Sequence, residues 1–169
     1  MAEATGEKLI FLHGQESSGQ GFKGRLLREI FPAILTPDFT GTLEERMVQL
    51  APILGEQAGW TIIGSSLGGL MAALWTCARP MQVRKLILLA PALHLPAFAA
   101  HRPAAIDVPV VIYHGRRDTV VPLPMVEALA ERVFRQLVFH VVDDDHRLHA
   151  TVQAIDWPAL VRDSPVRSA

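Results

Sequence analysis

Residues 60–80 read WTIIGSSLGGLMAALWTCARP, and this stretch decides the fold. A short apolar run over residues 60–63 meets a turn rich in glycine and serine at residues 64–69. Apolar residues then recur at helical spacing until Arg79 and Pro80 end the segment. The pattern predicts a strand, a tight turn and a helix, with Ser66 inside the turn.

Ser66 is the centre of a Gly-x-Ser-x-Gly pentapeptide, the pattern of a nucleophile elbow. A sharp reversal strains the backbone at the serine, and a Cβ two residues to either side would clash across the bend. Gly64 and Gly68 remove both clashes, whereas Ser65 has apolar residues at the equivalent positions. We therefore expect the Ser66 hydroxyl at the end of the sheet, before the free N–H groups and positive dipole end of a helix.

Composition and charge limit the classes of protein that fit. The chain has 169 residues, 50% of them hydrophobic and 20% charged, with a net charge of −1 at pH 7. These values indicate one globular domain over residues 1–169, with its core over about residues 8–157. No basic run is present, so nucleic acid and anionic membranes are poor candidates as partners.

The sequence carries no clear signal for export or for crossing a membrane. The longest apolar run, residues 86–100, is interrupted by Pro91, His94 and Pro96 and is too short to span a bilayer. Residues 1–8 lack the order of a signal peptide, and Cys77 is the single cysteine. We expect a cytoplasmic protein without disulfides.

Apolar segments alternate with helical patterns along the chain. The expected strands cover residues 8–12, 33–35, 60–63, 83–90, 108–113 and 137–142. The expected helices cover residues 22–31, 42–54 and 70–78, followed by a helix from Pro124 and an amphipathic stretch to about residue 157. This order predicts an α/β protein, a three-layer α/β/α sandwich around a mainly parallel sheet of about six strands.

Some segments carry further local expectations. Thr42 and Glu45 have the spacing of a capping box, and Pro52 is expected to kink or split the helix that they open. Residues 91–107 show no clear period, and residues 161–169 resemble a loosely held polar tail.

Ligands of such sheets gather at the carboxyl ends of the strands. The loops expected to form the site are therefore those that follow His13, Ile63, Ala90, Tyr113 and Val142.

Two of these loops carry the groups that a serine nucleophile needs. A serine hydroxyl requires a base within hydrogen-bond reach, and the base requires a third group that holds its tautomer. Asp118 lies in the loop after the penultimate strand, and His146 lies in the turn after the last strand. We expect Ser66 to be the nucleophile, His146 the general base and Asp118 the orienting acid.

The pentapeptide and the order Ser, Asp, His resemble the α/β-hydrolase superfamily over about residues 8–157. Within it the chain looks closest to the compact, lidless bacterial serine esterases of the YqiA type. The resemblance implies a minimal α/β-hydrolase fold, an oxyanion hole formed by the backbone N–H groups of Leu67 and Gln15, and a reaction without metal or organic cofactor. Only residues 91–107 occupy the position of a lid, which implies an open site.

The acid has alternative candidates. One of the three adjacent carboxylates at residues 143–145 could take this role. Asp118 could instead cap the following helix or pair with Arg116 or Arg117. The two arginines could also meet an anionic substrate, although a solvated loop pair is the simpler interpretation.

The histidines also admit other interpretations. His149 follows His146 by about one helical turn and could exchange roles with it. An Asp/His metal cluster over residues 143–149 matches no strong ligand spacing. His13 and His114, each at a strand end, are interpreted as structural rings that bond the loop backbone.

The expected reaction is hydrolysis of a carboxylic ester with a small or medium acyl group. Five apolar residues are expected near the rim of the substrate pocket: Leu93, Leu95, Phe98, Val120 and Met125. The expected partner is a small-molecule ester or thioester. An acyl thioesterase or deacylase, and a non-catalytic binding protein with the same fold, remain alternatives.

Overall fold

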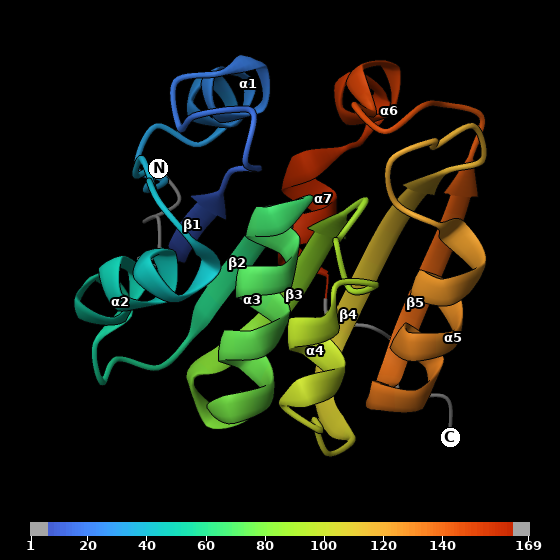
Figure 1. Cartoon of the computed structure of the whole chain (residues 1–169). Coiled ribbons are helices and arrows are strands. Elements are labelled where there is room, and N and C mark those ends of the chain that lie inside the picture. Colours follow the sequence, from blue (N-terminus) through green and yellow to red (C-terminus); the bar gives the residue numbers. More distant parts are fainter. Residues whose placement is uncertain (1–6, 164–169) are drawn as a thin grey trace.

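A single five-stranded sheet forms the centre of the computed structural model, which describes residues 7–163 (Figure 1). The strands lie in chain order and every neighbouring pair is parallel. They are β1 (Lys8–Leu12), β2 (Trp60–Ser65), β3 (Val83–Leu89), β4 (Ile106–Gly115) and β5 (Phe134–Val142).

Helices connect the strands and cover both faces of the sheet (Figure 1). They are α1 (Phe22–Ile30), α2 (Leu43–Leu54), α3 (Leu67–Ala78), α4 (Pro96–Ala100), α5 (Leu123–Val133), α6 (His149–Ala154) and α7 (Trp157–Arg162), with the 3-10 turn η1 (Pro80–Gln82) before β3. One buried cluster joins the sheet to α2, α3, α4 and α5, and a second joins its other face to α1, α6 and α7. The predicted three-layer α/β/α sandwich is confirmed.

Successive residues of the central strands contribute to opposite clusters. Ile62 packs on the side of α2 to α5, whereas Ile63 packs on the side of α1, α6 and α7. Leu88 and Leu89 divide in the same way. Since both faces are covered, both positions must be apolar, which explains the nearly continuous apolar runs of these strands.

The expected strand at residues 33–35 is reduced to one isolated bridge, so the sheet has five strands and not six. Leu35 pairs with Ile10, its N–H donating to Leu9 (3.0 Å) and its carbonyl accepting from Phe11 (2.8 Å). Pro37 follows two residues later and lacks the N–H that would continue a ladder.

Of the kink or split expected at Pro52, the split does not occur, because α2 is one helix that contains this residue. The missing N–H would have bonded the carbonyl of Val48, a residue that is 73% exposed. The capping box at the start of α2 is confirmed, with Thr42 and Glu45 each bonding the other's backbone N–H.

Two further segments differ from their expected forms. The segment without a clear period contains α4, whose Phe98 is fully buried. The expected loose tail begins inside α7, where Val161 is fully buried, and residues 164–169 lie outside the described residues.

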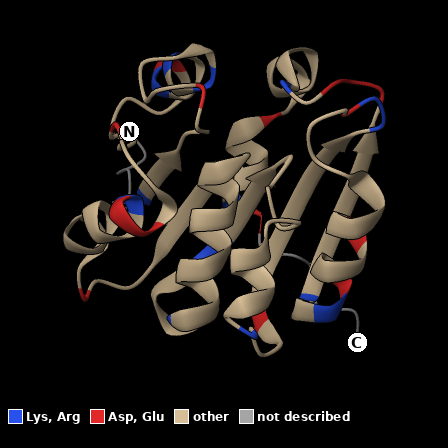
Figure 2. Cartoon of the chain, viewed as in Figure 1, with Lys and Arg blue, Asp and Glu red and all other residues tan. Residues whose placement is uncertain are grey.

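The charged residues belong mainly to helices and loops (Figure 2). Acidic and basic residues are interspersed in this view, in keeping with the net charge of −1. Among residues 7–163, no helix combines the length and the apolar composition that crossing a bilayer demands.

Candidate active site

Ser66 stands between β2 and α3 with φ 55° and ψ −115°. L-residues rarely adopt this region, so the backbone is strained at the serine. A Cβ on Gly64 would lie 2.5 Å from the Gly68 carbonyl oxygen, and a Cβ on Gly68 would overlap the carbonyl oxygen of Leu12. The close approach of these segments requires both glycines.

Backbone hydrogen bonds hold the strained turn. The Ser66 N–H donates to Leu89 at 3.0 Å. The Ser66 carbonyl accepts from Leu70 in α3 at 3.1 Å and from Ala92 in the loop after β3 at 3.0 Å. The turn is therefore fixed from both sides, and with it the position of the serine hydroxyl.

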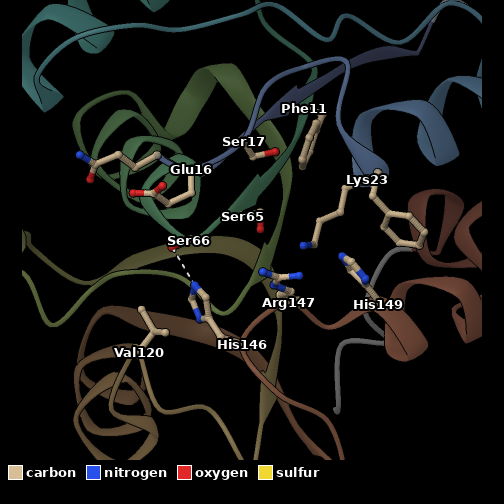
Figure 3. Close-up of a pocket in the computed structure, with 13 residues that line it drawn as sticks. Phe11, Glu16, Ser17, Lys23, Ser65, Ser66, Val120, His146, Arg147 and His149 are labelled. Atoms are coloured by element: carbon tan, nitrogen blue, oxygen red, sulfur yellow. Dashed lines mark hydrogen bonds between the residues drawn. The ribbon is translucent and has the colours of Figure 1, made fainter.

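The side chains of Ser66, His146 and Asp118 lie in contact. His146 Nε2 is 3.1 Å from Ser66 Oγ (Figure 3), and His146 Nδ1 is 2.8 Å from Asp118 Oδ2. The Asp118 side chain is fully buried and that of His146 is 21% exposed. With its Nδ1–H donated to the carboxylate, His146 presents the lone pair of Nε2 to the serine hydroxyl.

Asp118 is held by its own loop. Its Oδ1 accepts hydrogen bonds from the N–H groups of Val120 and Val121, both at 2.8 Å. Burial would raise the pKa of Asp118, but hydrogen bonds from Val121, His146 and Val120 outweigh it and hold the pKa below its ordinary value. The carboxylate is therefore ionised at neutral pH.

His13 supports the first loop, in agreement with its structural interpretation. Its Nε2 accepts from the Phe39 N–H at 2.8 Å, so its Nδ1 carries the proton donated to the Gly14 carbonyl at 2.6 Å. Burial lowers the pKa of His13, which favours this neutral ring.

Two backbone N–H groups near the serine have no acceptor among the residues that the structure describes. A Cβ on Gly14 would lie 3.3 Å from Ser66 Cβ, which places this loop directly against the serine. The next residue, Gln15, lines the cavity beside Ser66, and Leu67 begins α3. Within residues 7–163, neither the Gln15 nor the Leu67 amide donates a hydrogen bond.

The alternative acids are engaged elsewhere. Asp143 contacts Arg117 at 3.1 Å, and Asp144 accepts from the N–H and hydroxyl of Thr151 at 2.9 and 2.7 Å. Asp145 accepts from the N–H of residue 147 at 2.9 Å. None of the three contacts His146 as Asp118 does.

His149 is also separated from the contacts of Ser66. Its ring lies 4.2 Å from that of Phe22, centroid to centroid. In the described part of the chain, no group of three or more His, Cys, Asp or Glu side chains could hold a metal ion. The interpretation of residues 143–149 as a metal cluster is therefore not supported.

A cavity of about 640 Å³ opens beside Ser66 and His146 (Figure 3). Of the five apolar residues expected at its rim, only Val120 lines it. Leu93 and Phe98 are instead buried core residues, 1% and 0% exposed, and Leu95 packs against the same core. Met125 is 51% exposed and lies outside the lining.

The assignments of Leu93, Leu95 and Phe98 need correction because the segment after β3 packs into the core. That of Met125 needs correction because this exposed residue of α5 does not reach the cavity lining. The lining comes mainly from the other side, where Phe11 and Phe22 are its large apolar residues. Glu16, Lys23 and Arg147 supply its charges. Phe22 and Lys23 follow the loop that leaves β1, so the carboxyl end of β1 was the signal that could have identified them.

The fold recurs among solved structures, although no protein-family model and no curated protein matches the chain. A protein from Xanthomonas campestris pv. campestris, assigned provisionally as a hydrolase of the alpha/beta superfamily, is 29% identical with a TM-score of 0.73, covering 88% of this chain and 91% of that one. The esterase Pf2001 from Pyrococcus furiosus is 20% identical, with a TM-score of 0.71 and coverage of 92% and 81%. Est1E from Butyrivibrio proteoclasticus is 18% identical, with a TM-score of 0.72 and coverage of 94% and 90%.

Closer kinship with the YqiA type stays a prediction from the motifs. The neighbours match the sheet and its helices over most of both chains. Between β3 and β4, where a lid would be inserted, this chain has only the short α4. The protein is an α/β-hydrolase-fold protein of a compact, lidless form.

Proposed function

We propose that the protein is a serine hydrolase that cleaves carboxylic esters of small or medium acyl groups through an acyl-enzyme formed on Ser66. The observation that carries the proposal is the continuous series of contacts from Ser66 Oγ to His146 Nε2 (3.1 Å) and from His146 Nδ1 to Asp118 Oδ2 (2.8 Å). The strained backbone of Ser66 supports it, because strain at a polar residue beside a cavity is typical of functional sites.

Acylation starts with proton transfer from the Ser66 hydroxyl to His146 Nε2 while Oγ attacks the ester carbonyl. Asp118 stabilises the imidazolium through its hydrogen bond to Nδ1–H. The N–H groups of Leu67 and Gln15 are the proposed donors to the developing oxyanion, since neither has an acceptor within the described residues. The C–O bond to the alcohol then breaks, and His146 gives its proton to the leaving oxygen.

Deacylation repeats these steps with water in place of serine. His146 takes a proton from the water, whose oxygen attacks the acyl carbonyl, and returns it to Ser66 Oγ as the acid leaves. The cavity opens to solvent, so water reaches the acyl-enzyme without movement of a lid.

A fluorophosphonate probe tests the nucleophile. We expect the wild type to be labelled and Ser66→Ala to remain unlabelled, with matched circular dichroism spectra as the control for folding. Equal labelling of both proteins would exclude Ser66 as the nucleophile, and labelling of neither would favour a non-catalytic binding protein.

A series of p-nitrophenyl esters tests the reaction and the acyl length. We expect Ser66-dependent turnover with a maximum at short or medium chains, because the cavity is about 640 Å³. Acyl-CoA substrates with the same acyl groups are assayed in parallel. A higher kcat/KM for the acyl-CoA than for the matching p-nitrophenyl ester would indicate a thioesterase.

A further inference from the structure

Two cationic side chains enter the cavity beside the serine. Lys23 comes from α1, and Arg147 directly follows His146. Both extend toward the space next to Ser65, whereas Glu16 lies on the opposite side of Ser66 (Figure 3). One side of the cavity is therefore cationic.

These two cations have no ion-pair partner in the described part of the chain. Among residues 7–163, no carboxylate lies within 4.0 Å of either one. Asp144 and Asp145 are close enough to influence Lys23, but both oxygens of Asp144 and Oδ1 of Asp145 accept hydrogen bonds from Thr151 or from backbone N–H groups.

The surroundings of Lys23 make its charged form unfavourable unless an anion is bound. Its side chain is half-buried among the apolar lining of the cavity, which includes Phe11 and Phe22. Burial lowers the pKa of Lys23 to about 8, although Asp144 and Asp145 act in the opposite direction. A bound anion would replace the lost hydration of the ammonium group.

We propose that the substrate of the esterase carries a carboxylate, which Lys23 and Arg147 bind beside Ser66; this inference rests on the proposed function. A guanidinium fork pairs with a carboxylate through two parallel hydrogen bonds, and the ammonium adds a third donor. A single negative charge suits the site better than a dianion, because Glu16 also lines the cavity and two aspartates lie behind Lys23. Arg116 and Arg117, which the sequence suggested for an anion, lie outside the lining.

Two pairs of esters locate the carboxylate within the substrate. In the acyl pair, mono-p-nitrophenyl adipate is compared with p-nitrophenyl hexanoate, which has the same chain length and no charge. In the leaving-group pair, the hexanoate ester of 3-hydroxybenzoate is compared with that of 3-hydroxybenzamide. Hydrolysis measured with Ser66→Ala is subtracted, so that spontaneous cleavage does not contribute.

In one of the two pairs we expect wild-type kcat/KM for the charged ester to exceed that of its neutral match by at least about tenfold. Lys23→Met and Arg147→Met should each reduce the ratio, and the double variant should bring it close to one. Arg116→Met is the matched control, since it removes an exposed cation outside the cavity and should leave the ratio unchanged. If Lys23→Met fails to fold, Arg147→Met still tests the inference, because Arg147 is exposed and its replacement should not disturb folding.

The inference would be overturned by Ser66-dependent hydrolysis in which neither pair favours the charged ester. It would also be overturned if the double variant kept the wild-type ratio. Absence of Ser66-dependent hydrolysis of every ester would instead remove the proposed function, and this inference with it.

Discussion

His114 Nε2 lies 3.2 Å from Asp118 Oδ2, the same oxygen that contacts His146 Nδ1 at 2.8 Å. His114 Nε2 is also 3.0 Å from the Val121 carbonyl, which can only accept, so this nitrogen carries the proton. Burial lowers the pKa of His114, despite opposing effects of the Val121 carbonyl and Asp118, so the ring is neutral at pH 7. His114 is thus a neutral buried ring that contacts the proposed acid and donates its proton to the Val121 carbonyl.

His114→Phe should therefore weaken the positioning of Asp118. We expect kcat to fall by about tenfold with little change in KM, because His114 bonds the carbonyl of Val121, whose N–H holds Asp118 Oδ1. Steady-state kinetics on a p-nitrophenyl ester measure both constants. His140→Phe is the control, because this exposed ring stacks on Tyr113 and does not contact Asp118. An unchanged kcat in His114→Phe would show that Asp118 keeps its position without this ring.

The backbone of Ser66 allows activity and stability to be separated. Ser66→Ala and Ser66→Gly should both lose turnover, by about 10⁴-fold or more. Glycine adopts a φ of 55° without strain, whereas alanine retains the strain, of order 1–3 kcal/mol. We expect the glycine variant to melt about 2–4 °C above the alanine variant in thermal denaturation. A lower melting temperature for the glycine variant would mean that the turn stores no strain.

The fold could largely be predicted from local sequence because its strands are buried on both faces. Ile62, Ile63, Leu88 and Leu89 need no alternation when helices cover both sides of the sheet, and such runs are visible in a sequence. The bridge at Leu35 differs, since pairing with Ile10 depends on tertiary contact and ends before a proline. The apolar character of a short segment does not reveal how many hydrogen bonds it makes to a neighbouring strand.

The contacts of Ser66, Asp118 and His146 could be expected because topology brings strand ends together. The cavity could not, since its walls depend on how each loop folds after leaving its strand. Leu93, before α4, and Phe98, within it, are buried in the core, whereas Lys23 reaches the cavity from α1. Periodicity contains no signal for these directions.

Replacing His146 and His149 by alanine, one at a time, tests which of them is the general base. His146→Ala should lower kcat/KM by about 10³-fold or more, because within residues 7–163 only His146 is in position to accept the proton of Ser66 Oγ. His149→Ala should have a much smaller effect, since this ring packs on Phe22. Kinetics of both variants on one ester give the comparison, and a larger loss in His149→Ala would reassign the base.

Asp118 should make stability depend on pH in the acid range. Its pKa is lower in the folded state than its ordinary value, because the hydrogen bonds from Val121, His146 and Val120 outweigh burial. The stabilisation is therefore complete above the unfolded pKa of about 3.9 and is lost as the pH falls through the folded value. Asp118→Asn should lower the melting temperature at neutral pH, and the difference should shrink toward about pH 3.

The surface residue Asp107 provides the control for this measurement. It pairs with Arg135 at 3.1 Å, and both side chains are more than half exposed, at 69% and 61%. Asp107→Asn should show little difference from the wild type at any pH. A melting difference for Asp118→Asn that stays constant with pH would contradict the role of its ionised form.

Lys23 gives the carboxylate preference its own dependence on pH. The groups that influence Lys23 are Asp144, Asp145 and Arg147, with His149 and Glu16 also lining the cavity. Since burial lowers the pKa of Lys23 to about 8, the ammonium is lost as the pH rises through this value. The kcat/KM ratio for the charged and neutral esters should therefore fall between about pH 7 and pH 9.5, whereas Lys23→Met should show a lower ratio that stays level. A wild-type ratio that does not change over this range would mean that Lys23 does not contact the carboxylate, and Arg147 would then be its sole cationic ligand.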